Sequence, residues 1–365
     1  MPRIRHIGIL TGGGDCPGIN AVIRAVVKTA VHVHGLRVTG FLDGFAGLMS
    51  GAARSLGFDD VSGIVVQGGT ILGTSNRDDP FRIPVPGAGG TSFEDRSAVA
   101  LETLARLEVD ALVVIGGDGS LRIADRFAAK GVLVVGVPKT IDNDLAETDV
   151  TFGYDSARAV ATEAVDRLHT TAASHHRIMV VEVMGRHAGW IALEAGLAGG
   201  GDVILIPEIP FTWDAVARGI RARAAEGRRS SIVVVAEGAR QPSGDAVVSR
   251  LVEGSPDPVR LGGISAVTAR ELETRLPFEA RHVVLGHVQR GGTPTAFDRI
   301  LATRFGAAAV RAVAEGSWGS MVALKGDRIE RVPIRSAVAH PKLVDPAGER
   351  VSVARGLRTI FGDEA

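Results

Sequence analysis

Short runs of apolar residues alternate along the chain with longer stretches in which apolar positions recur at helical spacing. The runs Ala111–Ile115 and Val132–Val137 are apolar throughout, which is typical of strands buried on both faces. The first run ends at a glycine turn, and the pattern after it predicts a helix over Leu121–Lys130. Strand, turn and helix in repeated order indicate a parallel sheet that is covered by helices.

The same alternation continues through most of the sequence. It predicts further strands at 6–10, 177–183, 203–206, 231–236 and 281–285, and helices over about 19–33, 156–172, 188–198, 212–226, 263–274 and 297–315. Three segments differ. Residues 81–90, rich in Pro and Gly, are expected to form a surface loop, 239–261 is a variable stretch, and 318–365 has a weaker pattern that fits either half of the chain.

We therefore expect an α/β fold with two halves, the first of which ends near Gly153. Ligands of such folds gather at the carboxyl ends of the parallel strands. The glycine turns at 12–14, 116–119 and 291–292 each lie near a predicted strand end or helix start. These three turns are predicted to converge on one site.

Composition excludes several classes of protein. The 365 residues contain 41 basic and 41 acidic side chains, a balance that argues against a nucleic-acid or membrane-surface binder. The single cysteine, Cys16, excludes an intrachain disulfide and is read as a small filler residue. The apolar runs are too short to span a membrane, and no signal-peptide pattern is present. We expect a cytoplasmic protein.

The segment GGDGS at 116–120 follows a predicted buried strand. Gly116, Gly117 and Gly119 allow a sharp turn and a close approach of backbone to ligand. Ser120 is expected to cap the following helix, so that backbone N–H groups face a phosphate. Asp118 lies inside this turn, where its carboxylate could meet a magnesium ion carried by phosphates.

The segment PKTIDND at 138–144 has the same layout, because it also follows an apolar run. It delivers Lys139, Thr140, Asp142 and Asp144 to one strand end. A cation, a hydroxyl and two carboxylates beside a phosphate cradle are the groups that phosphoryl transfer requires.

Five segments together resemble the bacterial-type 6-phosphofructokinases over about residues 5–315. They are LTGGGDCPGIN at 10–20, GGDGS at 116–120, PKTIDND at 138–144, VVEVMGRHAGW at 180–190 and LGHVQRGG at 285–292. The lysine of PKTIDND resembles the mixed-substrate branch, which uses ATP or pyrophosphate. The resemblance implies two doubly wound, Rossmann-like domains with the active site in the cleft between them. Residues 1–153 plus about 289–340 would form the donor domain, and 154–288 plus about 341–365 the fructose 6-phosphate domain.

The resemblance also implies catalytic roles in the committed step of glycolysis. Asp142 would remove the proton from the 1-hydroxyl of fructose 6-phosphate, and Asp144 would orient that base or the metal. Thr140 would donate a hydrogen bond to the phosphoryl group in flight, which Arg186 would stabilise electrostatically. Asp118 would hold Mg²⁺.

The substrate-binding residues follow from the same motifs. Met184 and Gly185 would line the sugar, and Glu237 would accept hydrogen bonds from its hydroxyls. Arginine forks bind a phosphate dianion bidentately, and the 6-phosphate pocket would contain Arg177, Arg281, His287 and Arg290. In the family, the first two of these arginines come from the neighbouring subunit, which implies a homodimer or homotetramer with shared active sites.

On the donor side, Gly13 and Arg77 resemble nucleotide- or diphosphate-binding positions, and Gly117 and Ser120 belong to the phosphate cradle. Two positions point to different donors: Gly119 is the ATP-type residue, whereas Lys139 is the pyrophosphate-type residue. Steric and charge exclusion discriminates more firmly than one added cation attracts. ATP is therefore the favoured donor, with pyrophosphate as the alternative.

Other readings remain open at this point. The GGDG turn also occurs in NAD and lipid kinases, and sedoheptulose 7-phosphate would be a possible second acceptor. A catalytically dead regulatory subunit would normally lack the base or the metal carboxylate, both of which are present here. At the family's effector site, Arg24 and Lys28 stand at two basic positions, whereas His169 replaces an arginine and Glu226 a lysine. We expect a weakened or altered effector response.

Overall fold

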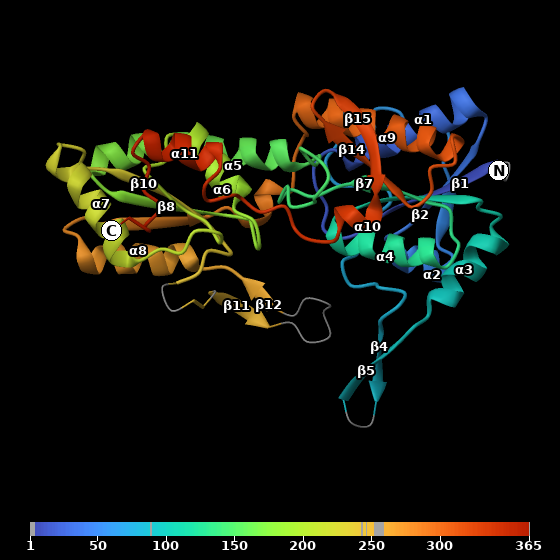
Figure 1. Ribbon diagram of the computed structural model, residues 1–365, viewed down its shortest axis with the longest axis horizontal. Helices are drawn as coiled ribbons and strands as arrows, with labels where there is room; N and C mark the ends of the chain where they lie inside the picture. Colours follow the sequence, from blue (N-terminus) through green and yellow to red (C-terminus); the bar gives the residue numbers. More distant parts are fainter. Residues whose placement is uncertain (1–3, 88–89, 242–243, 246, 252–258, 365) are drawn as a thin grey trace.

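The computed structural model describes residues 4–364 except 88–89, 242–243, 246 and 252–258, and it places two parallel sheets side by side (Figure 1). The first sheet has seven strands in the order β15-β14-β7-β6-β1-β2-β3. Its central strands are parallel, and only the two edge strands β3 and β15 run antiparallel to their neighbours. The strands are β1 His6–Thr11, β2 Arg37–Phe41, β3 Ala53–Ser55, β6 Ala111–Gly116, β7 Val134–Pro138, β14 Ser320–Lys325 and β15 Arg328–Pro333.

The second sheet has four strands, all parallel, in the order β13-β8-β10-β9. They are β8 Ile178–Val183, β9 Val203–Leu205, β10 Ser231–Ala236 and β13 Ala280–Val284. Every residue of β1, β6, β7, β8 and β10 is buried, as the continuous apolar runs predict for strands covered on both faces. The predicted α/β fold class is confirmed.

Helices cover both faces of each sheet (Figure 1). The first sheet packs between α1 and α9 on one face and α2, α3, α4 and α10 on the other; α5, α6 and α11 lie on the opposite side of the second sheet from α7 and α8. The helices are α1 Ile19–His34, α2 Phe45–Ser50, α3 Ser97–Arg106, α4 Asp118–Ala129, α5 Tyr154–His175, α6 Trp190–Ala198, α7 Trp213–Ala225, α8 Ile264–Arg275, α9 Ala296–Ala314, α10 Ile334–Ala337 and α11 Glu349–Gly356, with short 3-10 turns η1 Asp59–Val61, η2 Ile64–Val66 and η3 Gly286–Gln289.

The two halves are joined by buried contacts. One hydrophobic cluster runs beneath α1, α9, α5 and α6 and includes residues from both sheets. The start of α5 is fixed by Asp298 of α9, whose carboxylate accepts hydrogen bonds from the backbone N–H of Gly153 (2.9 Å) and from the backbone N–H and hydroxyl of Ser156 (2.8 and 2.6 Å). Burial raises the pKa of Asp298 to about 6. The helix that leaves the first half is thus anchored by a polar contact inside the core.

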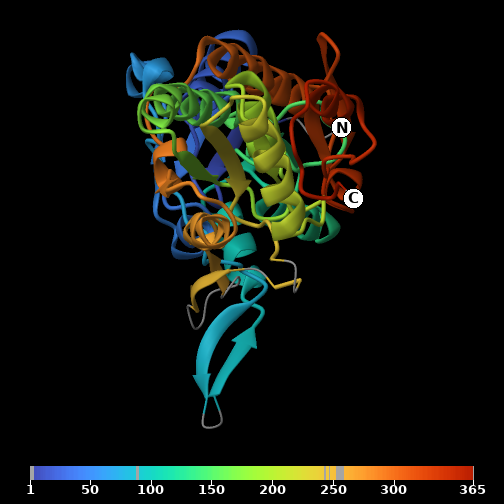
Figure 2. The same ribbon diagram turned by 90° about the vertical axis from the view of Figure 1, so that its left-hand side faces the viewer.

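One expectation needs correction. Residues 81–90 are not merely a loop: β4 Ile83–Gly87 and β5 Gly90–Glu94 form an antiparallel hairpin that projects from the body of the protein (Figure 2). In the variable stretch, β11 Val248–Leu251 and β12 Val259–Leu261 form a second small ribbon, while the residues between them lie outside the described part.

The weakly patterned segment 318–365 contributes to both halves. Strands β14 and β15 extend the first sheet beyond β7, with Ser320 opposite Val135. Further along, Ile360 forms a parallel bridge with Val203 of the second sheet. Among the described residues, no helix is both long and apolar enough to cross a membrane.

Candidate active site

The site begins where β1, β6 and β7 end next to one another. The backbone N–H of Gly12 donates to the carbonyl of Ile115 (2.9 Å), and that of Lys139 donates to the carbonyl of Gly116 (2.9 Å). A Cβ atom at Gly12 or Gly116 would collide with the side chain of Ser120. Glycine at these two positions is therefore required for the turns to meet.

Ser120 does not cap α4, contrary to the expectation from the sequence. The helix begins at Asp118, with Gly117 at the N-cap position and no side-chain cap. Ser120 instead lies buried inside the first turn, beneath the two glycine turns. The N-terminus of α4 still offers its backbone N–H groups to an anion, because no side chain of the cap occupies them.

Gly13 brings the segment of Arg77 next to the phosphate cradle. Its φ of +80° lies in the left-handed region that favours glycine, and its N–H donates to the carbonyl of Ser75 (2.9 Å). Arg77 follows two residues later with an exposed side chain. The structure thus places this predicted donor-side arginine beside the first glycine turn.

Lys139 is buried, and its ammonium donates to the backbone carbonyl of Gly14. Burial is the main influence on this group and lowers the pKa of Lys139. The lysine therefore contacts the first glycine turn directly, from the strand that also carries the acidic motif.

Asp142 has the properties of a general base. Burial and the neighbouring Asp144 raise the pKa of Asp142 to about 6, and the positive charges of Arg290, Lys139 and Arg186 act against this rise. Its Oδ1 atom is buried and has no hydrogen-bond partner among the residues that the structure describes. Such an unpaired oxygen is costly in a finished core, so it indicates a site that awaits a donor.

Thr140 and Asp144 support the same loop. The backbone N–H of Asp142 donates to the hydroxyl oxygen of Thr140 (3.1 Å). Burial raises the pKa of Asp144, whereas hydrogen bonds from its own backbone and from Thr140 lower it. The negative charge of Asp118 also raises the pKa of Asp144, which places these two carboxylates within electrostatic reach of each other.

Asp118 is half-exposed at the start of α4 and accepts hydrogen bonds from the Nε of Arg122 (2.9 and 3.0 Å). Across the described residues, no three His, Cys, Asp or Glu side chains gather as a complete metal site. Mg²⁺ commonly uses one or two carboxylates and takes its other ligands from water and substrate phosphates. The carboxylates of Asp118 and the nearby Asp144 offer only oxygen ligands, which fits this mode of Mg²⁺ binding.

The second sheet contributes Met184, Gly185 and Glu237 from the ends of β8 and β10. The N–H of Glu237 donates to the carbonyl of Val183 (2.9 Å), and the N–H of Met184 donates to the side-chain oxygen of Gln289 (3.4 Å). Gly185 has a φ of +135°, which a side chain would disfavour. Burial raises the pKa of Glu237 to about 7, assisted by the charge of Asp142.

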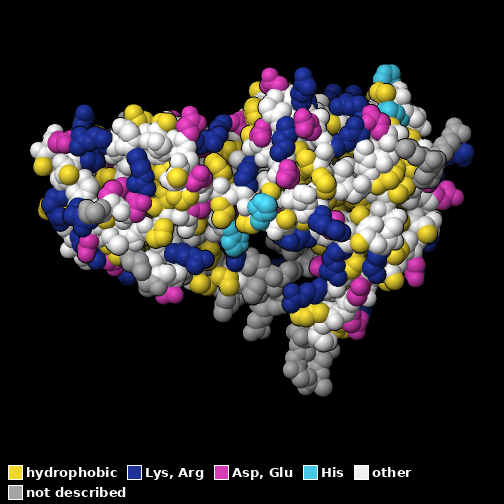
Figure 3. All heavy atoms as spheres, in the orientation of Figure 1, with side chains coloured by type: hydrophobic (Ala, Val, Ile, Leu, Met, Phe, Trp, Pro, Cys, Tyr) yellow, Lys and Arg dark blue, Asp and Glu magenta, His cyan; other side chains and the backbone are white. Residues whose placement is uncertain are grey.

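Two arginines lie within electrostatic reach of Asp142. Arg186 donates to the carbonyl of Val259 in β12 (3.0 Å), and Arg290 donates to the carbonyl of Asp15 in the first glycine turn (3.0 Å). Arg290 thereby joins the third glycine turn to the first, so the predicted convergence of turns is confirmed. Figure 3 shows basic side chains around the hollow between the two halves.

The four residues predicted for the 6-phosphate pocket are not brought together within one chain. His287 and Arg290 lie in and directly after η3, beside the carboxyl ends of the strands. Arg177 precedes β8, and Arg281 pairs with Met179 near the opposite end of that strand. Both arginines form ion pairs with Glu279. Seven residues of extended chain separate Arg177 from Met184, which is roughly 20 Å.

One residue in this site was missed in the sequence. His187 follows Arg186, and its electrostatic interaction with Asp144 lowers the pKa of that carboxyl. Its position inside the MGRHAGW motif was the available signal. Cys16 is buried and its thiol pKa is raised by burial to about 12, as expected of a filler residue.

Comparison with known proteins gives consistent results. The family model described as "Phosphofructokinase" matches residues 6–313. The chain is 51% identical over its full length to the full length of ATP-dependent 6-phosphofructokinase 2 of Clostridium perfringens. It is 54% identical, over 93% of its length and 96% of the relative, to pyrophosphate–fructose 6-phosphate 1-phosphotransferase of Amycolatopsis methanolica. The structure of T-state Pichia pastoris phosphofructokinase matches 98% of this chain and 37% of that one, with a TM-score of 0.80 and 35% identity.

Proposed function

This chain belongs to the phosphofructokinase family, and we propose that it transfers a phosphoryl group from ATP to the 1-hydroxyl of fructose 6-phosphate. The products are fructose 1,6-bisphosphate and ADP. The observation that carries the proposal is the buried Oδ1 of Asp142, which has no hydrogen-bond partner among the described residues and lies near three basic side chains at the junction of the two halves. The chemistry of a carboxylate base beside a phosphate cradle is what this reaction needs.

Asp142 acts as the general base. With a pKa of about 6, its carboxylate is mostly ionised at neutral pH and still basic enough to accept a proton. The proton of the 1-hydroxyl moves to Oδ1 as the hydroxyl oxygen forms its bond to the γ-phosphorus. The bond between that phosphorus and the bridging oxygen of ATP breaks, and ADP leaves with the electron pair.

The groups around Asp142 stabilise the phosphoryl group in transit and orient the base or the metal. Arg186 offsets the negative charge that spreads over the equatorial oxygens of the phosphoryl group in transit. Thr140 donates a hydrogen bond from its hydroxyl to the same group, and Asp144 orients the base or the metal. Asp118 would hold Mg²⁺, which when bound offsets charge on the donor phosphates.

Fructose 6-phosphate is bound by both halves of the cleft. Met184, Gly185 and Glu237 line the sugar, and His287 and Arg290 meet the 6-phosphate. Arg177 and Arg281 complete this pocket from a neighbouring subunit, so the active enzyme is a homodimer or homotetramer. Arg177 precedes β8 and Arg281 is the second residue of β13, so both lie toward the amino-terminal ends of these strands, which supports a role outside their own chain's site.

The donor is ATP rather than pyrophosphate. Relatives named for either donor are similarly close to this chain, so overall identity does not discriminate between them. Gly119 distinguishes the two donors. A Cβ atom built there meets nothing within 4 Å, so the space is open to an α-phosphate. Gly13, Arg77, Gly117, Ser120 and Lys139 form the remainder of the donor site.

We propose the domain division that the family resemblance implies. Residues 1–153 with about 289–340 form the donor domain, and 154–288 with about 341–365 the sugar-phosphate domain. The membership of β14 and β15 in the first sheet supports this assignment. We place the enzyme in the cytoplasm, where its phosphorylated substrates are found.

The test is formation of fructose 1,6-bisphosphate from fructose 6-phosphate and Mg²⁺, with ATP and pyrophosphate supplied in separate reactions. Turnover with ATP and little with pyrophosphate is the expected result. Turnover mainly with pyrophosphate would overturn the donor assignment. No turnover with either donor would overturn the reaction itself.

A further inference from the structure

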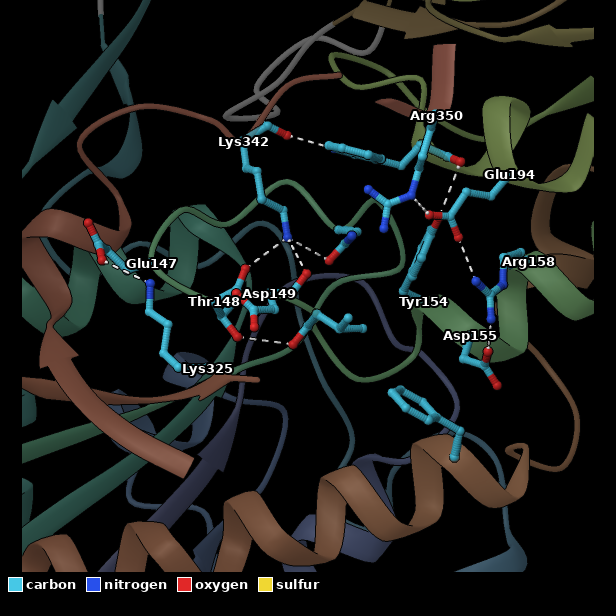
Figure 4. A pocket seen from close by; sticks show the side chains of 14 residues that line it. Glu147, Thr148, Asp149, Tyr154, Asp155, Arg158, Glu194, Lys325, Lys342 and Arg350 are labelled. Atoms are coloured by element: carbon cyan, nitrogen blue, oxygen red, sulfur yellow. Dashed lines mark hydrogen bonds and ion pairs between the residues drawn. The ribbon is translucent and has the colours of Figure 1, made fainter. Parts of the chain in front are cut away.

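A cavity of about 570 Å³ lies beside the loop that carries the acidic motif (Figure 4). Its walls come from both halves and from the C-terminal segment, and they include Asn143, Thr148, Asp149, Trp190, Glu194 and Lys342. None of these residues belongs to the proposed catalytic set. The cavity therefore exposes the rear of the catalytic loop rather than its reacting side.

Charged groups in this cavity are balanced, and most of them are paired. Glu194 accepts from Arg158 (2.5 Å) and Arg350 (2.9 Å), and Lys325 lies 3.4 Å from Glu147 (Figure 4). Lys342 differs from the other cations, because within the described part of the chain it forms no ion pair. Charge balance gives the cavity no strong preference for an anionic ligand.

The ammonium of Lys342 instead holds the loop after Asp142. It donates to the side-chain oxygen of Asn143 and to the backbone carbonyls of Thr148 and Asp149, each at 2.9 Å (Figure 4). The backbone N–H of Lys342 donates to the carbonyl of Asp144 (2.8 Å). An ammonium has three donors, and all three are used on one loop.

The same segment also reaches the loop of Arg186. The carbonyl of Lys342 accepts from the indole N–H of Trp190 (2.9 Å). Two residues on, the N–H of Val344 donates to Glu208 (2.9 Å), whose carboxylate also accepts from the N–H of Gly189 (2.9 and 3.1 Å). Residues 341–344, which we call the strap, are thus bonded both to the loop of Asp142 and to the loop that follows Arg186.

We propose that Lys342 is a positioning residue for phosphoryl transfer, which acts through the strap to fix the loop of Asp142 relative to that of Arg186. The inference rests on the proposed function for the roles of those two residues. The base comes from the first half and the arginine from the second, so their spacing depends on what links the halves. A misplacement of about 1 Å costs on the order of a hundred-fold in rate.

The first variant is Lys342→Met, which keeps the length of the side chain but removes all three donors. We expect kcat to fall by about ten- to a hundred-fold, while KM for fructose 6-phosphate changes less than about three-fold. The matched control is Lys325→Met, because Lys325 lines the same cavity but its ion pair with this loop is to the exposed side chain of Glu147 (3.4 Å), and not to the loop backbone or Asn143. The control should retain the kcat of the parent enzyme.

Chemical rescue separates positioning from general damage. In Lys342→Cys, alkylation of the introduced thiolate by 2-bromoethylamine displaces bromide and restores an ammonium at nearly the original length. The only native cysteine, Cys16, is buried with a pKa of about 12 and should not react. We expect alkylation to restore most of the lost kcat, and the same treatment to leave the parent enzyme unchanged.

A second variant, Trp190→Phe, and a second measurement test the same proposal independently of kcat in Lys342→Met. Trp190→Phe removes the indole donor while keeping an aromatic ring at this position, and it should lower kcat by about three- to ten-fold. Hydrogen–deuterium exchange should show faster exchange of the amide of Thr151, which donates to Asn143 (3.1 Å), in Lys342→Met than in Lys325→Met. Exchange reports on the loop even if the parent enzyme proves inactive on fructose 6-phosphate.

The outcomes are distinct. Equal kcat in Lys342→Met and Lys325→Met, a loss confined to KM, failure of alkylation to restore kcat, or unchanged exchange at Thr151 would overturn the positioning role. Absence of turnover in the parent enzyme would overturn the proposed function instead.

Discussion

Replacement of Gly119 by aspartate should shift the donor preference from ATP toward pyrophosphate. Gly119 lies in the first turn of α4, outside the left-handed region of φ, and a Cβ there meets nothing within 4 Å. The variant should therefore fold without strain. A carboxylate in the first turn of a helix even stabilises it by about 0.3–1 kcal/mol. Any loss of activity must then come from the ligand side.

The size of that loss follows from the charge. Two like charges about 5 Å apart at an effective dielectric constant of about 20 repel by roughly 3 kcal/mol. The adjacent Asp118 side chain is 47% exposed, so screening by solvent will reduce this value. We expect kcat/KM for ATP to fall by about ten- to a hundred-fold, with little change for pyrophosphate, which has no α-phosphate of a nucleotide to repel.

The assay is the initial rate of fructose 1,6-bisphosphate formation, measured with each donor in turn. Gly119→Asn is the control for size without charge, and Gly119→Ala tests the Cβ alone. If charge decides, asparagine should retain much more ATP activity than aspartate. An unchanged ratio of ATP to pyrophosphate activity in Gly119→Asp would refute the reasoning.

Three further predictions follow from the site. Asp142→Ser should lower kcat by at least about a thousand-fold while fructose 6-phosphate still binds, as calorimetry of the variant would test. In the parent enzyme, kcat/KM should fall as pH drops through about 6, because the raised pKa of Asp142 means that the base is protonated there; a profile flat to pH 5 would contradict this. Mixed oligomers of Asp142→Ser and Arg177→Ala subunits should regain about a quarter of parental activity at low fructose 6-phosphate, since half of randomly paired dimers would each contain one complete site. No regain would place Arg177 outside the neighbour's site.

The parts of the fold that the sequence predicts well are those with local causes. The strand Ala111–Gly116 is apolar at every position but the last, a pattern that favours a strand covered on both faces. Glycines in the turns after β1 and β6 are equally informative, because a Cβ there would strike Ser120. The fold and the position of the acidic motif at a strand end could be predicted for this reason.

Other features depend on contacts that no local pattern encodes. The hairpin at 83–94 has prolines at 84 and 86, which suggest a loop, yet a two-stranded ribbon leaves one side of each strand unpaired and tolerates them. Ser120 follows a glycine turn, as a helix-capping residue would, but its side chain packs beneath that turn and does not cap the helix. The contact of Lys342 with Asn143 joins residues 199 positions apart. Only the folded chain brings these two together.

The charges around Asp142 explain why a buried carboxylate can serve as a base in this cleft. Burial and Asp144 raise its pKa, and Arg290, Lys139 and Arg186 lower it, so the value of about 6 reflects a balance of opposing effects. Both phosphate-bearing substrates are anions, and in the proposed complex they approach those same cations. Their charge offsets the cations, and the base therefore becomes stronger when sugar phosphate and donor are both bound. A group that gains basicity only in the complete complex accepts its proton when the phosphoryl group is in place to react.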